Sequence, residues 1–179
     1  MNRDLHDIQA ILERTPRVLN ALLRDLPESW TLTNEGGDSW TPVAIVAHYI
    51  DSERHNWITR AQLILESSAP PTFPTFARAG HIAEAEGKTL PQLLDLFADL
   101  RRQNLSALHA LHLKPTDLER TGIHPAFGPV TLGNLLATWA AHDLTHLHQL
   151  SRTLAHQLRE DVGPWTAYLG VMKCTGHSS

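Results

Sequence analysis

The segment Thr131–Leu150, TLGNLLATWAAHDLTHLHQL, has the strongest helical pattern in this chain of 179 residues. Thr131 is a residue type that caps helix starts, and Gly163 with Pro164 supplies a stop signal farther along the chain. The pattern predicts a long helix over residues 131–159 with one apolar face. The large apolar side chains of this face recur every three or four residues: Leu132, Leu136, Trp139, Leu147, Leu150 and Leu154.

Three other segments, residues 4–26, 42–66 and 90–111, show the same spacing and are also predicted to be helices. Strand signals are weak, although a short pairing within residues 121–130 stays open. The connections 67–88 and 112–130 are longer than those that usually join antiparallel neighbours. The sequence therefore predicts an all-α fold, a four-helix bundle with long crossover connections.

The composition is that of an ordinary globular chain, with 42% hydrophobic and 19% charged residues. Its length suits one domain, which we expect to span residues 1–179. The net charge is −4 and the Lys and Arg residues are scattered, which argues against a nucleic acid or a membrane as partner. A single cysteine, Cys174, excludes an internal disulfide, and no apolar run approaches the ~18 residues of a membrane span. We expect a cytoplasmic protein.

Histidine is over-represented, with 12 residues in 179. Imidazole is the commonest metal ligand in proteins and a usual proton carrier near neutral pH. His142 and His146 are four residues apart, so they lie within about 40° of each other on one face of the predicted helix. This spacing lets two imidazoles reach one metal ion, although a histidine-rich chain also produces it by chance. We expect His148 and His156 to be surface histidines.

A third ligand would come from the predicted helix 42–66, where His48 and His55 share one face. Small apolar neighbours favour His48 for a packed helix contact, but the residues alone leave both histidines open. Asp51 or His55 could relay protons to such a site. The cluster of Asp51, Glu53 and Arg54 is otherwise interpreted as solvated helix surface.

Two polar residues of the predicted helix 131–159 are candidates for supporting roles. Asp143 falls at about 100° from His142, inside the apolar stripe, where an unpaired carboxylate is costly. We therefore expect it either to orient a ligating imidazole or to bond an arginine, a Trp N–H or a helix N-terminus. Gln149 lies on the histidine face and could contact bound water or substrate. The sequence contains no HExxH, P-loop or GxSxG motif.

Three segments resemble the DinB-like, YfiT-related superfamily of bacterial helical proteins: WTPVAIVAHYIDSERHNW (40–57), GPVTLGNLLATWAAHDLTHLHQL (128–150) and GPWTAYLGVM (163–172). The resemblance implies a four-helix bundle in which a long crossover joins two helix pairs. It also implies a divalent metal held by His48, His142 and His146, all of which this chain retains. Members with assigned activity are thiol-dependent transferases and isomerases, and other members are described as metal-dependent hydrolases.

The leading hypothesis is a metal-dependent enzyme that acts on a small molecule, as a thiol-dependent S-transferase or as a hydrolase. Three imidazoles accept several divalent ions, of which zinc or nickel leads the candidates. A low-molecular-weight thiol such as bacillithiol, mycothiol or glutathione would be the co-substrate for transfer. The alternatives are a non-catalytic metal-binding stress or sensor protein and a helical interaction module. An apolar face left on residues 4–26 or 90–111 could support a homodimer.

Overall fold

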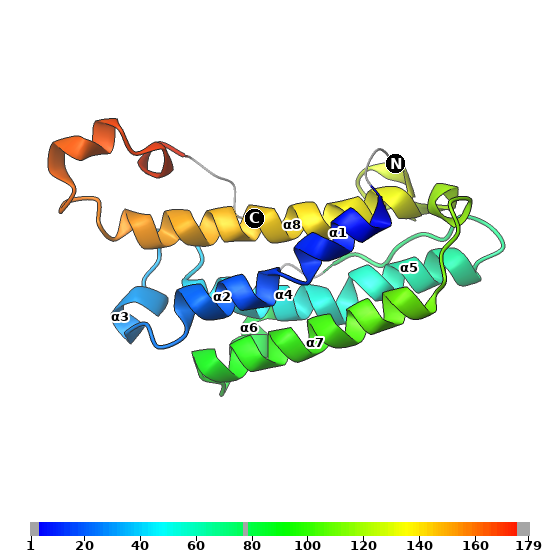
Figure 1. Cartoon of the computed structure of the whole chain (residues 1–179), viewed down its shortest axis with the longest axis horizontal. Helices are drawn as coiled ribbons and strands as arrows, with labels where there is room; N and C mark the ends of the chain where they lie inside the picture. The colour runs from blue at the N-terminus through cyan, green and yellow to red at the C-terminus, as the bar shows by residue number, and fades with distance from the viewer. Residues whose placement is uncertain (1–3, 77–78, 175–179) are drawn as a thin grey trace.

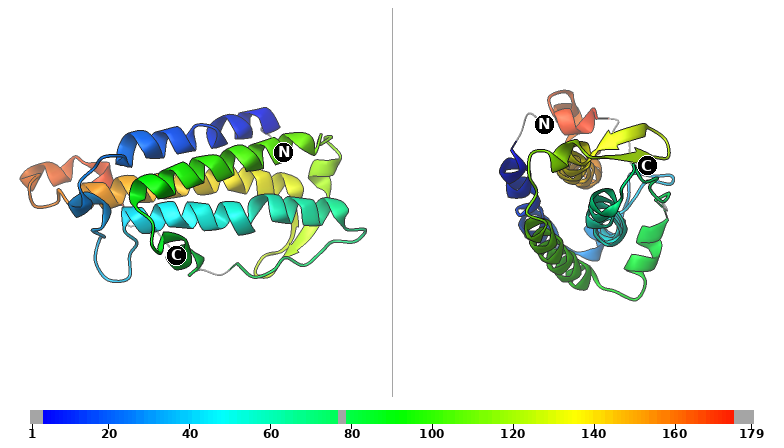
Figure 2. Two further views of the ribbon diagram at one scale, coloured as in Figure 1. Left: turned by 90° about the horizontal axis from the view of Figure 1, so that it is seen from below. Right: turned by 90° about the vertical axis from the view of Figure 1, so that its right-hand side faces the viewer.

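Four helical segments run lengthwise in the structure, a computed structural model that describes residues 4–76 and 79–174 (Figure 1). Views across and along these segments show them packed side by side (Figure 2). The predicted all-α four-helix bundle is therefore confirmed. The segments are α1 (Leu5–Leu12) with α2 (Thr15–Leu23), α4 (Pro42–His55) with α5 (Trp57–Glu66), α7 (Leu90–Ala110), and α8 (Leu132–His156).

Threonine side chains begin three of these segments. Thr41 Oγ1 accepts a hydrogen bond from the backbone N–H of Ala44 at 3.2 Å, at the start of α4. Thr89 begins α7 and Thr131 begins α8, each in a capping box in which the side chain three residues later bonds back to the threonine N–H. These caps satisfy N–H groups that have no partner within the helix, so the helix starts follow directly from the sequence.

Two of the predicted helices are each interrupted once. Pro16 has no backbone N–H to donate to the Leu12 carbonyl, and the first segment breaks between α1 and α2. Asn56, with φ −114° and ψ −71°, departs from ideal helical angles and separates α4 from α5. The segments 4–26 and 42–66 therefore each contain two shorter helices where the periodicity predicts one.

The connections between the long segments, and the chain after α8, contain short elements that the periodicity does not predict. One of them, α6, lies in the long connection that follows α5 and packs against α4. Another is an antiparallel hairpin, which is the short pairing that the sequence left open. The short elements are α3 (Glu28–Thr31), α6 (Gly80–Ala85), η1 (Asp117–Glu119), β1 (Thr121–His124), β2 (Gly128–Thr131), η2 (Gly163–Ala167) and η3 (Gly170–Met172).

The hairpin is tied to the crossover that follows α5. The backbone N–H of Phe73 donates to the Ile123 carbonyl at 2.9 Å, and the Ile123 N–H donates to the Pro71 carbonyl at 2.7 Å. Gly122 makes this approach possible, because a Cβ at this position would lie 2.5 Å from the Phe73 ring. The crossover is thereby held along the side of the bundle (Figure 2).

The buried side chains form two apolar clusters along the bundle. One is built around Trp57 and Trp139, whose rings stack with centroids 5.9 Å apart. The other contains Tyr49 and Phe97, with ring centroids 5.0 Å apart. Both clusters contact the His142 ring, one through Trp57 and the other through Tyr49. Within the described residues, none of the helices combines the length and apolar character needed to cross a membrane.

Candidate metal centre

Three histidines from two helices converge between the apolar clusters. His48 lies on α4, and His142 and His146 lie one turn apart on the facing side of α8. One ring nitrogen from each lies within 4.8 Å of the other two. The Nε2 atoms of His48 and His142 are 3.0 Å apart. The structure thus brings together His48 and the predicted pair on α8.

Burial keeps these imidazoles neutral. His48 is 8% exposed and His146 is 7% exposed. Burial, together with the neighbouring His146, lowers the pKa of His48 to about 3. Burial likewise lowers the pKa of His142 to about 2 and lowers the pKa of His146. Because only a neutral imidazole has a lone pair to offer, all three rings are in the ligand form at pH 7.

The spacing of the ring nitrogens fits a metal ion. Two nitrogen lone pairs that face each other repel unless a proton or a cation lies between them. Nitrogens bound at about 2.0–2.1 Å to a tetrahedral ion lie roughly 3.3 Å apart, close to the 3.0 Å between the Nε2 atoms of His48 and His142. Both Nδ1 atoms of these rings are buried and have no hydrogen-bond partner among the described residues. The Nε2 atoms, which lie next to each other, are therefore the nitrogens of these two rings that could bind one shared ion.

Gln149 holds His146 in place. Its Oε1 atom lies 2.7 Å from His146 Nδ1, and the residue is only 2% exposed. An amide oxygen accepts a hydrogen bond, so Nδ1 carries the proton and Nε2 keeps its lone pair for a metal. Gln149 therefore orients a histidine, and its predicted contact with bound water or substrate stays a prediction.

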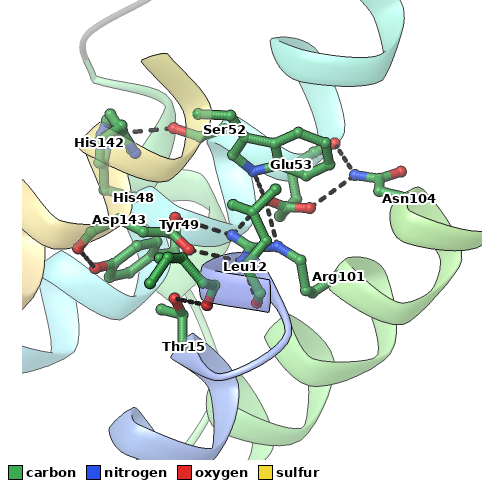
Figure 3. Close-up of polar contacts among 12 residues, drawn as sticks. Leu12, Thr15, His48, Tyr49, Ser52, Glu53, Arg101, Asn104, His142 and Asp143 are labelled. Carbon is green, nitrogen blue, oxygen red and sulfur yellow. Dashed lines mark hydrogen bonds and ion pairs between the residues drawn. The ribbon is translucent and has the colours of Figure 1, made fainter. Parts of the chain in front are cut away.

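Asp143 bonds an arginine rather than an imidazole, which corrects the first of the two expectations for this residue. Arg101 of α7 donates from Nη1 to Asp143 Oδ2 at 2.6 Å and from Nη2 to Asp143 Oδ1 at 2.9 Å (Figure 3). The Asp143 backbone carbonyl also accepts a hydrogen bond from the Tyr49 hydroxyl at 2.6 Å. Asp143 thus connects α8 to α7 and α4.

Glu53 is the second carboxylate on Arg101, and its position corrects the interpretation of this part of α4 as solvated surface. Glu53 is 3% exposed, and its Oε1 accepts hydrogen bonds from Arg101 Nη2 and Trp139 Nε1, each at 2.9 Å. Asn104 Nδ2 donates to Oε2 at 2.8 Å (Figure 3). The sequence argument missed both Glu53 and Arg101, although both fall within apolar stripes.

Asp51 and His55 lie away from the three histidines. The Asp51 carboxylate packs against α6, where a Cβ added to Gly80 would collide with its Oδ2. Asp51 is 5% exposed, its Oδ2 has no partner among the described residues, and burial raises its pKa. His55 is exposed, with Nε2 3.9 Å from Asp51 Oδ1. Neither residue belongs to the histidine cluster, so no direct contact with these histidines supports the predicted proton-relay role.

Aromatic side chains cover the cluster. Trp40 lies with its ring centroid 4.8 Å from that of His48 and 6.0 Å from that of His146. The ring of Phe76 meets His48 edge-on at 6.0 Å, and His81 of α6 lies 4.5 Å from Trp40. Loop residues before α4 and before α6 therefore shield the histidines, a feature that helical periodicity could not reveal.

A family model described as the DinB superfamily matches residues 11–150. The chain belongs to the DinB superfamily. A relative from Oceanobacillus iheyensis named "Putative metal-dependent hydrolase" is 27% identical over 149 residues, covering 78% of this chain and 80% of the relative. A relative with the same name from Bacillus mycoides is 27% identical over 137 residues, covering 75% of this chain and 76% of the relative.

Two solved structures share the fold of this DinB superfamily chain. YfiT from Bacillus subtilis, described as "a probable metal-dependent hydrolase with an unusual four-helix bundle topology", superimposes with a TM-score of 0.71 at 21% identity. The match covers 89% of this chain and 90% of YfiT. TT2238, described as a four-helix bundle protein, superimposes with a TM-score of 0.57 at 20% identity, over 84% of this chain and 100% of TT2238.

Proposed function

We propose that this DinB superfamily chain is a metal-dependent hydrolase that acts on a small molecule, with one divalent cation held by His48, His142 and His146. The observation that supports it most directly is the convergence of three neutral imidazoles whose ligand atoms lie within 4.8 Å of one another. Three protein ligands leave at least one coordination position open, as in catalytic rather than structural sites. The names of the two relatives agree with a hydrolytic reaction.

The side chains around the histidines have separable roles in this proposal. A divalent cation bound there supplies Lewis acidity, which lowers the pKa of a coordinated water or thiol. Gln149 fixes the tautomer of His146 through the 2.7 Å contact with Nδ1. Trp40 and Phe76 cover His48 and limit the access of bulk water. Zinc or nickel suits the all-imidazole donor set.

Thiol transfer to an electrophile is the second candidate reaction. The single cysteine, Cys174, is exposed near the C-terminal end of the described chain, with its Sγ 3.3 Å from the Gly170 carbonyl. It does not belong to the histidine cluster. A thiol nucleophile would therefore be a separate low-molecular-weight co-substrate, for which bacillithiol, mycothiol and glutathione are the candidates.

Metal content measured by inductively coupled plasma mass spectrometry tests the site before any substrate is known. We expect one equivalent of zinc or nickel per chain in the wild type after reconstitution, and a sharp loss in His48→Ala, His142→Ala and His146→Ala. His148→Ala is the matched control, because His148 lies on α8 but is exposed. A wild type that binds no metal after reconstitution would refute the proposal and favour an interaction module.

Turnover assays then separate hydrolysis from transfer. The metal-loaded protein is incubated with a panel of small esters and amides, and separately with monobromobimane and a panel of thiols. We expect metal-dependent hydrolysis that chelation with EDTA abolishes. Activity only in the presence of a thiol would indicate S-transfer instead of hydrolysis. Bound metal without any turnover would favour a non-catalytic sensor.

A further inference from the structure

Three charged side chains, one from each of three helices, contact one another in the core of the bundle. They are Glu53 of α4, Arg101 of α7 and Asp143 of α8, and each side chain is at most 1% exposed. Arg101 donates two hydrogen bonds to each carboxylate, at distances from 2.6 to 3.1 Å. We call these three residues the charged triad (Figure 3).

The charged triad lies on the same two helices as the three histidines. Glu53 follows His48 on α4 by five residues, and Asp143 stands between His142 and His146 on α8. Tyr49, directly after His48, also donates its hydroxyl proton to the Asp143 carbonyl at 2.6 Å. Both sets of bonds hold α4 against α8, and the separation of these helices sets the distance from His48 to the other two histidines.

The charges of the triad do not cancel. Two carboxylates face one guanidinium, so the triad has a formal charge of −1 in the core. The remaining donors to Glu53 are Trp139 Nε1 and Asn104 Nδ2, which satisfy its oxygens but bring no charge. Asp143, one of the two carboxylates, stands between His142 and His146 on α8. A cation among the histidines would balance the excess negative charge, because charges interact strongly in a medium of low polarity.

We propose that the charged triad, together with Tyr49, is a positioning element of the metal centre. It fixes the register of α4 against α8 and supplies the negative charge that favours a divalent cation over an empty site. The inference rests on the proposed metal site, but it concerns residues that touch neither metal nor substrate. Outer residues that orient metal ligands typically change metal affinity by about 10–100-fold when they are replaced.

The test is a titration with Co²⁺, followed by its visible absorption spectrum, which reports ligand geometry independently of activity. Glu53→Gln removes the excess charge and keeps the side-chain length, and we expect the Kd for Co²⁺ to rise about 10–100-fold. Asp99→Asn is the matched control, because it makes the same change in net charge at an exposed position. We expect this control to retain the wild-type Kd and spectrum.

A second variant keeps the inference testable if Glu53→Gln does not fold, which circular dichroism shows. Tyr49→Phe removes only the hydroxyl that bonds the Asp143 carbonyl, and the aromatic ring stays against Phe97. We expect a weaker Kd and a changed Co²⁺ spectrum, since the register of α4 and α8 is relaxed. Wild-type Co²⁺ binding in every folded variant would overturn the inference and leave the proposed function intact. A wild type that binds no Co²⁺ would overturn both.

Discussion

Replacement of Arg101 by methionine tests how much the charged triad contributes to the stability of the bundle. Methionine occupies part of the same space but leaves Glu53 and Asp143, whose side chains are fully buried, without a cation. Removal of one partner from a buried ion pair costs about 3–5 kcal/mol. An unfolding entropy of about 2.1 cal/mol/K per residue corresponds to about 0.38 kcal/mol/K for a chain of this length, so Tm falls by about 8–13 °C.

The free energy of unfolding is measured by urea denaturation monitored by circular dichroism, in the absence of metal. Arg102→Met is the control, because Arg102 is the next residue on α7 and pairs with Asp99 at the exposed surface. We expect this control to change stability by less than about 0.5 kcal/mol. The triple variant Arg101→Met/Glu53→Gln/Asp143→Asn removes all three charges of the triad, and we expect it to regain at least about 2 kcal/mol of the loss.

Two results would refute this reasoning. A loss below about 1 kcal/mol in Arg101→Met would mean that the two carboxylates do not need the guanidinium in the folded state. A triple variant as unstable as Arg101→Met would assign the loss to packing or to the Leu12 carbonyl, which Arg101 Nη1 also contacts at 2.7 Å. In either case the charge of the triad would not be the cause.

Three further predictions follow from the site and its surroundings. Zinc at 100 times its Kd should stabilise the fold by about 2.7 kcal/mol and raise Tm by about 7 °C. Differential scanning calorimetry should show this rise in His148→Ala but not in His142→Ala. Burial raises the pKa of Asp51 above its ordinary value of 3.8, so ionisation of this carboxyl opposes folding as pH rises through and above 3.8. By urea denaturation, Asp51→Asn should therefore be more stable than the wild type at pH 7, and this advantage should disappear below pH 3.8. Equal stability of the two proteins at pH 7 would contradict this prediction. Gly122→Ala places a Cβ 2.5 Å from the Phe73 ring and should lower the free energy of unfolding by about 1–3 kcal/mol in urea, whereas an unchanged value would mean that the crossover moves freely.

The long helices could be predicted because their signals are local. Capping residues and apolar spacing set the starts of α4, α7 and α8, and the structure has them where the sequence predicts them. The apolar periodicity does not contain the break between α4 and α5 at Asn56, nor the short helix α6, which packs against α4. The hairpin is similar, because its strands are held by the crossover through Phe73 and Ile123.

The positions of the histidines were likewise predictable where they depend on local helix spacing, but not where they depend on packing between separate helices. His142 and His146 face one way because they are one helical turn apart, which the sequence alone states. The choice between His48 and His55 needed either the family resemblance or the packing of α4 against α8. In the structure His48 is buried beside the pair, and His55 is exposed.

The members of the charged triad, in contrast, share a local spacing relative to apolar residues. Each is a charged residue that has a large apolar residue four positions before it and another four positions after it, which places it at the centre of an apolar stripe. Asp143 drew attention for this reason, but the same pattern occurs on two other helices. The spacing alone does not establish burial, because Arg54 lies between Ile50 and Ile58 in the same way and is exposed. The mutual pairing of one basic and two acidic side chains is what allows the triad to be buried, because each alone would be costly to bury. The flanking pairs are Tyr49 and Trp57, Phe97 and Leu105, and Trp139 and Leu147.

The break between α1 and α2 completes the pairing of Arg101. In an uninterrupted helix the Leu12 carbonyl would accept the N–H of residue 16, but residue 16 is a proline and has none. Arg101 Nη1 donates to this carbonyl, and its other four N–H groups go to the two carboxylates. A guanidinium has five N–H donors, so each one has an acceptor. Lysine has only three donors on one atom, and the position therefore requires arginine, whose bonds reach all three of the other helical segments.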